Sequence, residues 1–172
     1  ATGGGDVSVQ CSSKCVELVN NGHSIQVNVE PGATLTTPAG TYELVQFHFH
    51  SPSEHTVDGE HAAMEMHLVH TDATLRIGVV GVMIVEGAEN PFLAKLWPHI
   101  PPKKGSSDAV AGLAFGPTDL LPATRQTWRY TGSLTTPPCT EGVDWTLMRQ
   151  PLTASAEQIE AFRSVMFHNN RP

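Results

Sequence analysis

Residues 46–50, Gln46-Phe47-His48-Phe49-His50, form the stretch that decides the fold expected for this chain. In a β-strand successive side chains point to opposite faces, so His48 and His50 share one face while Phe47 and Phe49 share the other. The stretch therefore predicts a strand with one polar face and one apolar face, the second packed against another layer of the protein.

A second stretch with the same alternation follows at Glu65-Met66-His67. The connection over residues 51–58, together with Gly59, can turn the chain back on itself. An antiparallel neighbour would then bring His67 opposite the first histidine pair, on the same face as Glu65. The sequence thus predicts three imidazoles at one point.

Three imidazoles in this arrangement indicate a metal site. The chain has nine histidines, and an isolated histidine is more often a surface or core residue than a ligand. Histidines that share a buried face with a carboxylate are costly to bury without a common partner. Neutral nitrogen ligands without a thiolate favour Zn²⁺ in an open site with water as the fourth ligand. We therefore expect one zinc ion per chain.

The composition limits the class of protein. Of the 172 residues 40% are hydrophobic and 16% are charged, which suits a single domain over residues 1–172 with a sizeable core. No apolar run is long enough to span a membrane. The formal net charge of −7 and the lack of a basic stripe argue against a nucleic-acid partner, because its phosphates would be repelled.

Turn residues and apolar periodicity predict mostly strands. Residues 7–47 alternate between apolar and polar, with turns at Asn21-Gly22 and Pro31-Gly32. Residues 74–85 form a nearly continuous apolar run, which is typical of a central strand covered on both faces.

Two short helices interrupt this pattern. One is predicted over residues 90–100, with Asn90 at its start and Pro98 ending it. The other is predicted over residues 155–163, where Ser155 and Gln158 have the spacing of a capping box. Residues 101–107 are expected to form a loop, and residues 117–121 a turn or short helix.

The three cysteines, Cys11, Cys15 and Cys139, allow at most one internal disulfide. The spacing of Cys11 and Cys15 fits neither a zinc ribbon nor a thioredoxin-like pair. A structural disulfide or plain thiols are expected. Residues 1–6 are rich in glycine and have no apolar core, so they do not form a signal peptide.

Several motifs occur together in the order of a known family. The chain resembles an α-class carbonic anhydrase, most like the bacterial branch, over roughly residues 16–172, whereas residues 1–15 diverge. The resemblance implies a β-dominated α+β fold with a large, twisted, mixed and mostly antiparallel central sheet and a few short surface helices. The motifs are Asn20-Asn21-Gly22-His23, residues 46–50, residues 53–58, residues 63–70, residues 133–139 and Asn169-Asn170-Arg171-Pro172.

The resemblance implies which residues hold the zinc. His48, His50 and His67 match the family's ligands and are the same three that strand alternation selects. Gln46 and Glu65 match the groups that accept the free imidazole N–H of His48 and of His67. The implied activity is that of a carbonate dehydratase, the reversible hydration of carbon dioxide to bicarbonate and a proton by zinc-bound hydroxide. Weak ester hydrolysis and inhibition by anions and sulfonamides are implied with it.

Three further residues match catalytic positions of the family. Thr135 would accept the proton of the zinc-bound hydroxide and donate its own to Glu54, which aims the hydroxide at the substrate. His23 matches the proton-shuttle histidine, since imidazole titrates near neutral pH. Without the resemblance, Thr135 would be assigned to a Thr-Pro turn and His23 to an exposed turn.

The pocket for carbon dioxide is apolar in the family, and a small dry recess suits a substrate without a net dipole. The matching side chains would otherwise be ordinary core residues. They are Val69, Val79, Leu134, Thr136, Val143 and Trp145.

The remaining polar residues near these motifs have structural roles at most. Tyr130 and His55 match buried polar positions that support the site. Four histidines match no catalytic position: His61, His70, His99 and His168.

Both ends of the chain depart from the family pattern, which has a longer N-terminal segment and a last edge strand beyond Arg171-Pro172. Exposed sheet edges would favour a homodimer or an exchange of segments. Because the family's extracytoplasmic members pair the Cys139 position with a cysteine of that longer segment, Cys139 is expected to be free, to pair with Cys11 or Cys15, or to bond to another chain. The resemblance also implies a periplasmic or secreted protein.

Two other functions are compatible with parts of the sequence. An incomplete fold would favour a carbonic-anhydrase-like binding module with little turnover, although such modules typically lack one or more of the histidines retained here. An unrelated zinc hydrolase is disfavoured, because the sequence has no His-Glu-x-x-His helix.

Overall fold

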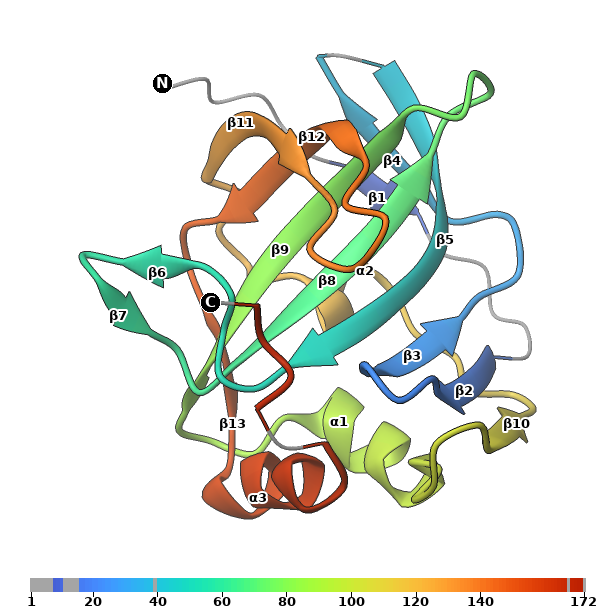
Figure 1. The fold of residues 1–172 in the computed structure, drawn as a ribbon, viewed down its shortest axis with the longest axis vertical. Helices are drawn as coiled ribbons and strands as arrows, with labels where there is room; N and C mark the ends of the chain where they lie inside the picture. The colour runs from blue at the N-terminus through green and yellow to red at the C-terminus, as the bar shows by residue number, and fades with distance from the viewer. Residues whose placement is uncertain (1–7, 11–15, 39, 167, 172) are drawn as a thin grey trace.

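One large sheet dominates the computed structural model, which describes residues 8–10, 16–38, 40–166 and 168–171 (Figure 1). The sheet has 11 strands in the central order β10-β2-β3-β5-β8-β9-β12-β11, and β4 pairs with β5, β1 with β4 and β13 with β9. Its strands are β1 (Ser8–Gln10), β2 (Val16–Asn20), β3 (Ile25–Asn28), β4 (Thr34–Thr37), β5 (Gly40–His50), β8 (Met64–Thr71), β9 (Ile77–Glu86), β10 (Ser107–Val110), β11 (Thr127–Ser133), β12 (Glu141–Met148) and β13 (Leu152–Ala154).

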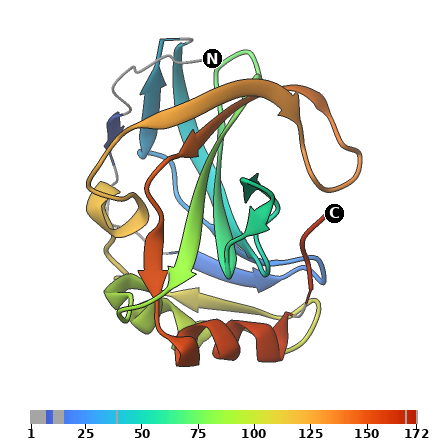
Figure 2. The ribbon, with the colours of Figure 1, turned by 90° about the vertical axis from the view of Figure 1, so that its left-hand side faces the viewer.

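The sheet is mixed. β12 and β13 run parallel to β9, and the other pairs are antiparallel. A separate hairpin of β6 (Thr56–Val57) and β7 (Glu60–His61) projects from the sheet (Figure 1). The helices α1 (Pro91–Leu96) and α3 (Ala156–Val165) lie together at one end of the sheet in both views (Figure 2). The predicted β-dominated α+β architecture is thus confirmed.

The alternation of β5 separates two faces of the sheet. Phe47 and Phe49 are fully buried in the main hydrophobic core. There the ring of Phe47 lies 6.0 Å from that of Phe92 of α1, and the ring of Phe49 lies 6.1 Å from that of Phe162 of α3, measured between centroids. The opposite face has a smaller apolar cluster, formed by Val79, Val143 and Trp145. The histidines of β5 therefore lie on the face that the helices do not cover.

A β-bulge in β5 sets which residues reach which face. The pairing with β8 shifts between Leu44 and Gln46, so Val45 is an extra residue in the strand. Leu44 and Phe47 both lie in the main core although they are three positions apart. A one-residue slip moves every later side chain to the other face, and the bulge thereby fixes the face on which the histidines lie.

The helix predicted over residues 90–100 is present in a divided form. The side chain of Asn90 accepts hydrogen bonds from the backbone N–H groups of Phe92 and Leu93, and α1 ends at Leu96. A 3₁₀ turn, η1 (Trp97–His99), then continues through Pro98, so the prediction that Pro98 ends the helical segment is wrong. Proline is accepted there because the first turn of a helix leaves its N–H unpaired in any case.

The helix α3 begins as the sequence predicts. Ser155 lies at its N-cap, where its hydroxyl accepts a hydrogen bond from the N–H of Gln158 at 3.2 Å. The side chain of Gln158 accepts one from the N–H of Ser155 at 3.1 Å, which completes the capping box. Ile159 and Phe162 are buried against the core.

Replacing Ser155 by Ala is expected to lower the free energy of unfolding by about 1 kcal/mol, because the backbone N–H of Gln158 in the first turn loses its side-chain acceptor. Urea unfolding followed by circular dichroism measures this change. Ser164→Ala is the matched control, since Ser164 lies exposed on the same helix and bonds only to the carbonyl of Ala161. An equal loss in both variants would contradict the capping role.

Four strands differ from the sequence prediction. The strand predicted from residue 74 begins at Ile77, because the carboxylate of Asp72 accepts hydrogen bonds from the N–H groups of Thr74 and Arg76 and holds a turn there. Leu75 in that turn is 81% exposed. Ser107 opens β10 instead of ending a loop, and β6 and β7 were not foreseen. β10 and the β6–β7 hairpin lie exposed, where a hydrophobic alternation is not needed. The turn or helix predicted at residues 117–121 is α2 (Pro117–Leu120).

Two further predictions concern membranes and cysteines. Within the described residues, no helix has the length and apolarity to cross a membrane. Cys139 forms no disulfide with any described residue, whereas Cys11 and Cys15 lie outside the described residues.

Candidate metal centre

The strand pair β5–β8 brings the predicted ligands together. The two strands are antiparallel with His48 opposite His67 and His50 opposite Glu65. The imidazole centroids lie 5.0 Å apart for His48 and His50, 5.3 Å for His48 and His67, and 4.7 Å for His50 and His67. One nitrogen of each ring lies within 4.8 Å of the others, a spacing that allows all three to bind one metal ion.

Hydrogen bonds at the back of two rings decide which nitrogen faces the centre. The Nδ1 atom of His48 lies 2.8 Å from Oε1 of Gln46, and Nδ1 of His50 lies 3.0 Å from the backbone oxygen of Asn169. The Nε2 atoms of these two rings are thereby left to face the centre. Nε2 of His50 is buried and has no hydrogen-bond partner among the described residues.

Asn169 is a member of this site that the sequence alone did not identify. Its backbone N–H and side chain also bond to Ser51, at 3.3 and 2.8 Å, so the C-terminal segment is held against the end of β5 (Figure 1). The contact joins residues 119 positions apart along the chain. No local pattern could have predicted it.

Glu65 stands behind His67. Its Oε1 atom lies 3.0 Å from Nε2 of His67, a close contact that is not aligned as a hydrogen bond. The same oxygen accepts from Nδ1 of His55 at 2.5 Å, and Oε2 accepts from the backbone N–H groups of Glu54 and His55, each at 2.9 Å. Nδ1 of His67 is left for the centre. These contacts fix the carboxylate and, through it, the imidazole.

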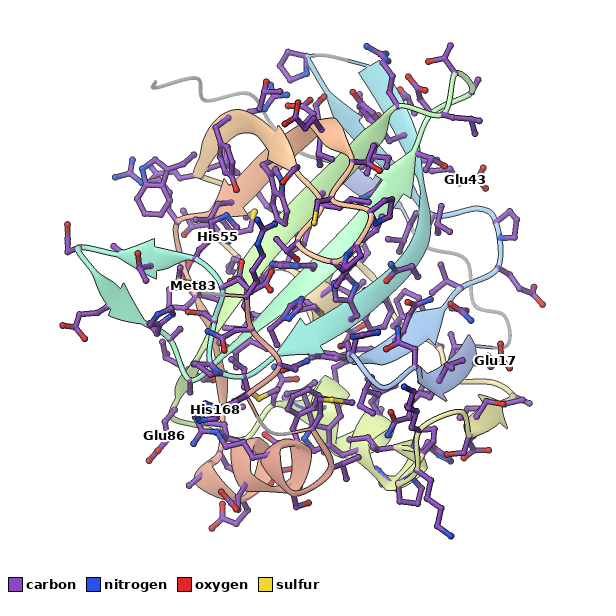
Figure 3. All side chains as sticks on the ribbon, viewed as in Figure 1. Glu17, Glu43, His55, Met83, Glu86 and His168 are labelled. Carbon is purple, nitrogen blue, oxygen red and sulfur yellow. The ribbon has the colours of Figure 1, made fainter. Side chains whose placement is uncertain are left out.

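His55 connects Glu65 to the sheet edge. Its Nε2 atom lies 2.6 Å from the hydroxyl of Tyr130, and the Tyr130 ring stacks on Trp145 with an interplanar angle of 3°. His55 is labelled in Figure 3. The expectation that Tyr130 is buried is wrong, because its side chain is 45% exposed. Tyr130 belongs to β11, which pairs only with β12 and so leaves one edge uncovered among the described strands.

His55, Glu65 and His67 also place one atom each within 4.8 Å of one another. The imidazole nitrogen of His55 and the carboxylate of Glu65 already face each other as hydrogen-bond partners. This second group is therefore a support for His67, and the three histidines form the better metal site.

Gly81 makes room for Glu65. A side-chain carbon on Gly81, which pairs with His67 across β8 and β9, would lie 2.9 Å from Oε1 of Glu65 and 3.0 Å from Leu147. Only glycine leaves this space without displacing the carboxylate. The signal in the sequence was a glycine inside an apolar strand, which often marks a close approach.

Burial and neighbouring groups together shift the pKa values of His48, His50 and Glu65. Burial lowers the pKa of His48 well below its usual range, and His67 and His50 lower it further. Burial and His67 likewise lower the pKa of His50. Burial alone would raise the pKa of Glu65, but His67 and the hydrogen bond from His55 outweigh it and hold that pKa well below its usual range. The centre thus combines neutral imidazoles at His48 and His50 with a carboxylate at Glu65 that stays ionised.

Glu54 and Thr135 lie close to the histidines but are not joined to each other. Oε1 of Glu54 lies 3.4 Å from Nδ1 of His50 and accepts from the N–H of Arg171 at 2.8 Å. Oε2 is buried 3.8 Å from Nδ1 of His67 and has no hydrogen-bond partner among the described residues. Thr135 lines the same cavities as Glu54, and no hydrogen bond between their described side chains is present.

His23 lies at the entrance. It is exposed and lines a cavity of about 350 Å³ together with Glu54 and Thr135. Its backbone is fixed, because its N–H bonds to the side chain of Asn21 at 2.8 Å and its carbonyl accepts from the side chain of Asn169 at 3.0 Å.

The predicted apolar wall forms a neighbouring cavity of about 180 Å³, which His48, His67 and Gln46 also line. The prediction that Val143 lines this cavity is wrong. Val143 is fully buried and packs in one apolar cluster with Val79 and Trp145, which do line the cavity. Val45, which the bulge turns towards this side, lines the cavity too and was not predicted. The predicted residues that line it are Val69, Val79, Leu134, Thr136 and Trp145.

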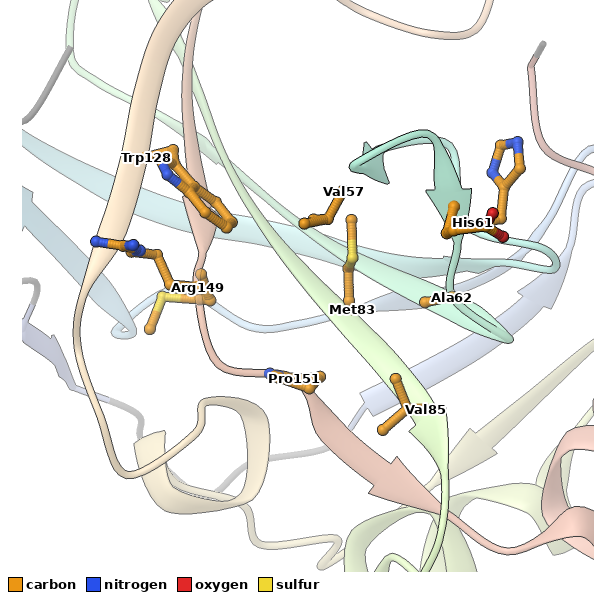
Figure 4. A pocket seen from close by; sticks show the side chains of 10 residues that line it. Val57, His61, Ala62, Met83, Val85, Trp128, Arg149 and Pro151 are labelled. Carbon is orange, nitrogen blue, oxygen red and sulfur yellow. The ribbon is translucent and has the colours of Figure 1, made fainter.

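A different cavity of about 280 Å³ lies away from the histidines, between the β6–β7 hairpin and the strands β9, β11 and β12 (Figure 4). Its lining is largely apolar and includes Met83, Trp128 and Met148. The guanidinium of Arg149 lies 5.0 Å from the centroid of the Trp128 ring. No predicted site residue lines this cavity.

His70 is a buried histidine outside the centre. Its Nδ1 atom lies 3.0 Å from the carbonyl oxygen of Leu68. Burial lowers the pKa of His70 from 6.5 to about 4, although backbone hydrogen bonds oppose the shift. The folded protein therefore favours neutral His70, whereas the unfolded chain takes up a proton below pH 6.5.

Stability should accordingly fall as the pH drops from 6.5 towards 4, and His70 should account for up to about 3 kcal/mol of that loss. The measurement is the free energy of unfolding against pH for the unaltered protein and for His70→Asn. The variant is expected to have a lower plateau but a flatter slope in this interval. Parallel curves would contradict the assignment.

Comparison with known proteins gives concordant matches. Residues 6–172 match the family described as eukaryotic-type carbonic anhydrase. The chain is 47% identical over 157 residues to the carbonic anhydrase of Pectobacterium carotovorum, which covers 91% of this chain and 64% of that protein. It therefore spans slightly less than two thirds of the length of that relative.

Solved structures agree with this match. The α-carbonic anhydrase from Thermovibrio ammonificans, in complex with the inhibitor sulfanilamide, superimposes with a TM-score of 0.93 at 45% identity, over 98% of this chain and 74% of that one. The α-carbonic anhydrase of Photobacterium profundum gives a TM-score of 0.91 at 43% identity, over 98% of this chain and 77% of that one.

Proposed function

The chain belongs to the eukaryotic-type carbonic anhydrase family, and from this membership we propose that it catalyses the reversible hydration of carbon dioxide with one zinc ion held by His48, His50 and His67. The observation that supports the proposal most strongly is the convergence of the three imidazoles, with Nδ1 of His48 bonded to Gln46 and Nδ1 of His50 bonded to Asn169.

The residues present fit Zn²⁺. The buried Nε2 of His50 has no partner within the described residues, and a buried polar atom of this kind is costly unless a ligand satisfies it. The donor set of three neutral nitrogens with no thiolate is that of an open zinc site. When bound, Zn²⁺ lowers the pKa of a coordinated water from 15.7 to about 7 and so supplies a nucleophile at neutral pH.

The residues behind the ligands hold them in place. Gln46 and the Asn169 carbonyl orient the rings of His48 and His50, and Glu65 orients His67 while it is itself held by His55. Such partners fix the tautomer and the angle of an imidazole, and losing one typically costs about 10- to 100-fold in metal affinity or activity.

We assign the orientation of the nucleophile to Thr135 and Glu54. Oε2 of Glu54, which accepts no hydrogen bond from the described residues, can accept the hydroxyl proton of Thr135, and both residues line the same cavity. The oxygen of Thr135 then acts only as an acceptor towards the nucleophile. A lone pair of the nucleophile would then point at the substrate. Binding of anions that have no proton to donate to Thr135 would be disfavoured.

Carbon dioxide and the released proton would be handled by different residues of the site. Carbon dioxide would lie in the apolar cavity beside His48 and His67, formed by Val69, Val79 and Trp145. His23, which lines the neighbouring polar cavity, would carry the released proton to solvent. Bicarbonate would leave by the same polar entrance.

The test is stopped-flow hydration of carbon dioxide by the purified protein, with its zinc content measured and sulfanilamide added. Turnover that sulfanilamide blocks, at one zinc per chain, supports the enzyme and a sulfonamide site like that of the Thermovibrio ammonificans relative. Bound zinc without turnover would instead support a binding module. The complete set of ligands argues for the enzyme, and weak ester hydrolysis is expected with it.

A further inference from the structure

The segment that follows α3 places a second histidine at the proton entrance. His168 lines the cavity of about 350 Å³ that also contains His23, Glu54 and Thr135, and its side chain is exposed to solvent (Figure 3). The sequence alone gave His168 no role, because the resemblance has no catalytic position there.

Asn169 ties the two histidine-bearing segments together. Its side-chain N–H donates to the carbonyl of His23 at 3.0 Å and to that of Phe49 at 2.8 Å, and its own carbonyl oxygen lies 3.0 Å from Nδ1 of the ligand His50. The residue next to His168 is thus bonded both to His23 and to the metal centre. These bonds hold the backbone next to His168 at the entrance.

The backbone of His168 is unusual for a residue that is not glycine. Its φ angle is 50°, in the left-handed region. A residue other than glycine is disfavoured in this region and adopts it where the surrounding bonds hold the backbone. Asn169 supplies these bonds through Ser51, Phe49 and His23.

We propose that His168 is a second proton-relay residue, which works beside His23 and carries the proton released by hydration from the cavity to solvent; this rests on the proposed function. Each turnover converts carbon dioxide and water into bicarbonate and one proton. An imidazole takes that proton on one ring nitrogen and releases one from the other to a buffer base, so it returns to its starting state.

The other charged groups of the cavity do not replace it. Among its described lining residues the remaining ionisable side chains are those of His23, Glu54 and Arg171. Glu54 is buried beside the ligands, and arginine keeps its proton. Only the two histidines have side chains of the type that exchanges protons near neutral pH and also reach solvent. Two relays allow one to accept a proton while the other still holds one.

The experiment measures ¹⁸O exchange between carbon dioxide and water in weakly buffered solution for the zinc-loaded protein. Exchange separates the interconversion of carbon dioxide and bicarbonate from the release of labelled water, which alone needs proton transfer. The variants are His168→Asn, His23→Ala and the double variant. Asparagine removes the titrating ring but tolerates the left-handed backbone.

We expect His168→Asn to slow water release about twofold alone and about fivefold more in the His23→Ala background, with imidazole in solution restoring both. The control is His99→Ala, which removes an exposed histidine paired with Asp108 on the surface. It should change neither the rate of interconversion nor the rate of water release. Equal water release by His23→Ala and the double variant would overturn the inference, as would a loss in the double variant that imidazole does not restore. Absence of interconversion in the unaltered protein would overturn the proposed function, and the inference with it.

Discussion

Replacing His48 by Ala is expected to lower the zinc affinity by about 100- to 1,000-fold and to reduce carbon dioxide hydration to the rate of the metal-free protein. Structural zinc binding is worth about 10–16 kcal/mol in total, so one nitrogen ligand accounts for roughly 3 kcal/mol of it. Without His48 the centre keeps only His50 and His67, both on its buried side. Zinc competition with a chromophoric chelator and stopped-flow hydration measure the two effects.

The matched control is His99→Ala, which removes an exposed imidazole whose contact with Asp108 lies on the surface. Pairs of this kind contribute little to stability. The control should bind one zinc ion and turn over normally. If His48→Ala also bound one zinc ion tightly and turned over normally, the metal would have to lie elsewhere in the molecule.

Thr135→Ala should lower kcat/KM for carbon dioxide hydration by about 100-fold while one zinc ion per chain stays bound, because the nucleophile loses the acceptor that aims it. The effect should include weaker discrimination among anionic inhibitors, since the hydroxyl that excludes anions without a donor is gone. Stopped-flow kinetics with a series of anions measures both quantities.

Thr135→Ser keeps the hydroxyl and removes only a methyl group, so it should retain most of the activity. Glu54→Gln should resemble Thr135→Ala, because Glu54 is the acceptor proposed for the threonine proton. A fully active Thr135→Ala protein, or one that loses its zinc, would contradict the orienting role.

Strand alternation alone was sufficient to predict which side chains converge. His48, His50, Glu65 and His67 repeat every second residue on strands that must pair, and the register of β5 and β8 places them together. The cap of α3 was equally readable, since Ser155 and Gln158 interact within one turn. Both signals are local, and their geometry follows directly from the period of the element.

The rest of the site depends on contacts that no local period encodes. The bulge at Val45 reverses the phase of β5, and Asn169 reaches His50 from the far end of the chain. Tyr130 matches a position that is buried in the family, but here it lies on an edge strand. Its exposure follows from the order of the strands. Sequence reasoning therefore predicted the ligands, whereas the groups that hold them required the tertiary structure.

The most direct test of the central claim is a titration of zinc into metal-free protein while carbon dioxide hydration is followed. No turnover is expected without metal, and the rate should rise linearly up to one equivalent of zinc and then stay constant, whereas His48→Ala should show no rise over the same range. Turnover that is independent of zinc, or a break at one equivalent of bound zinc without any turnover, would contradict the claim that these three histidines hold a catalytic metal ion.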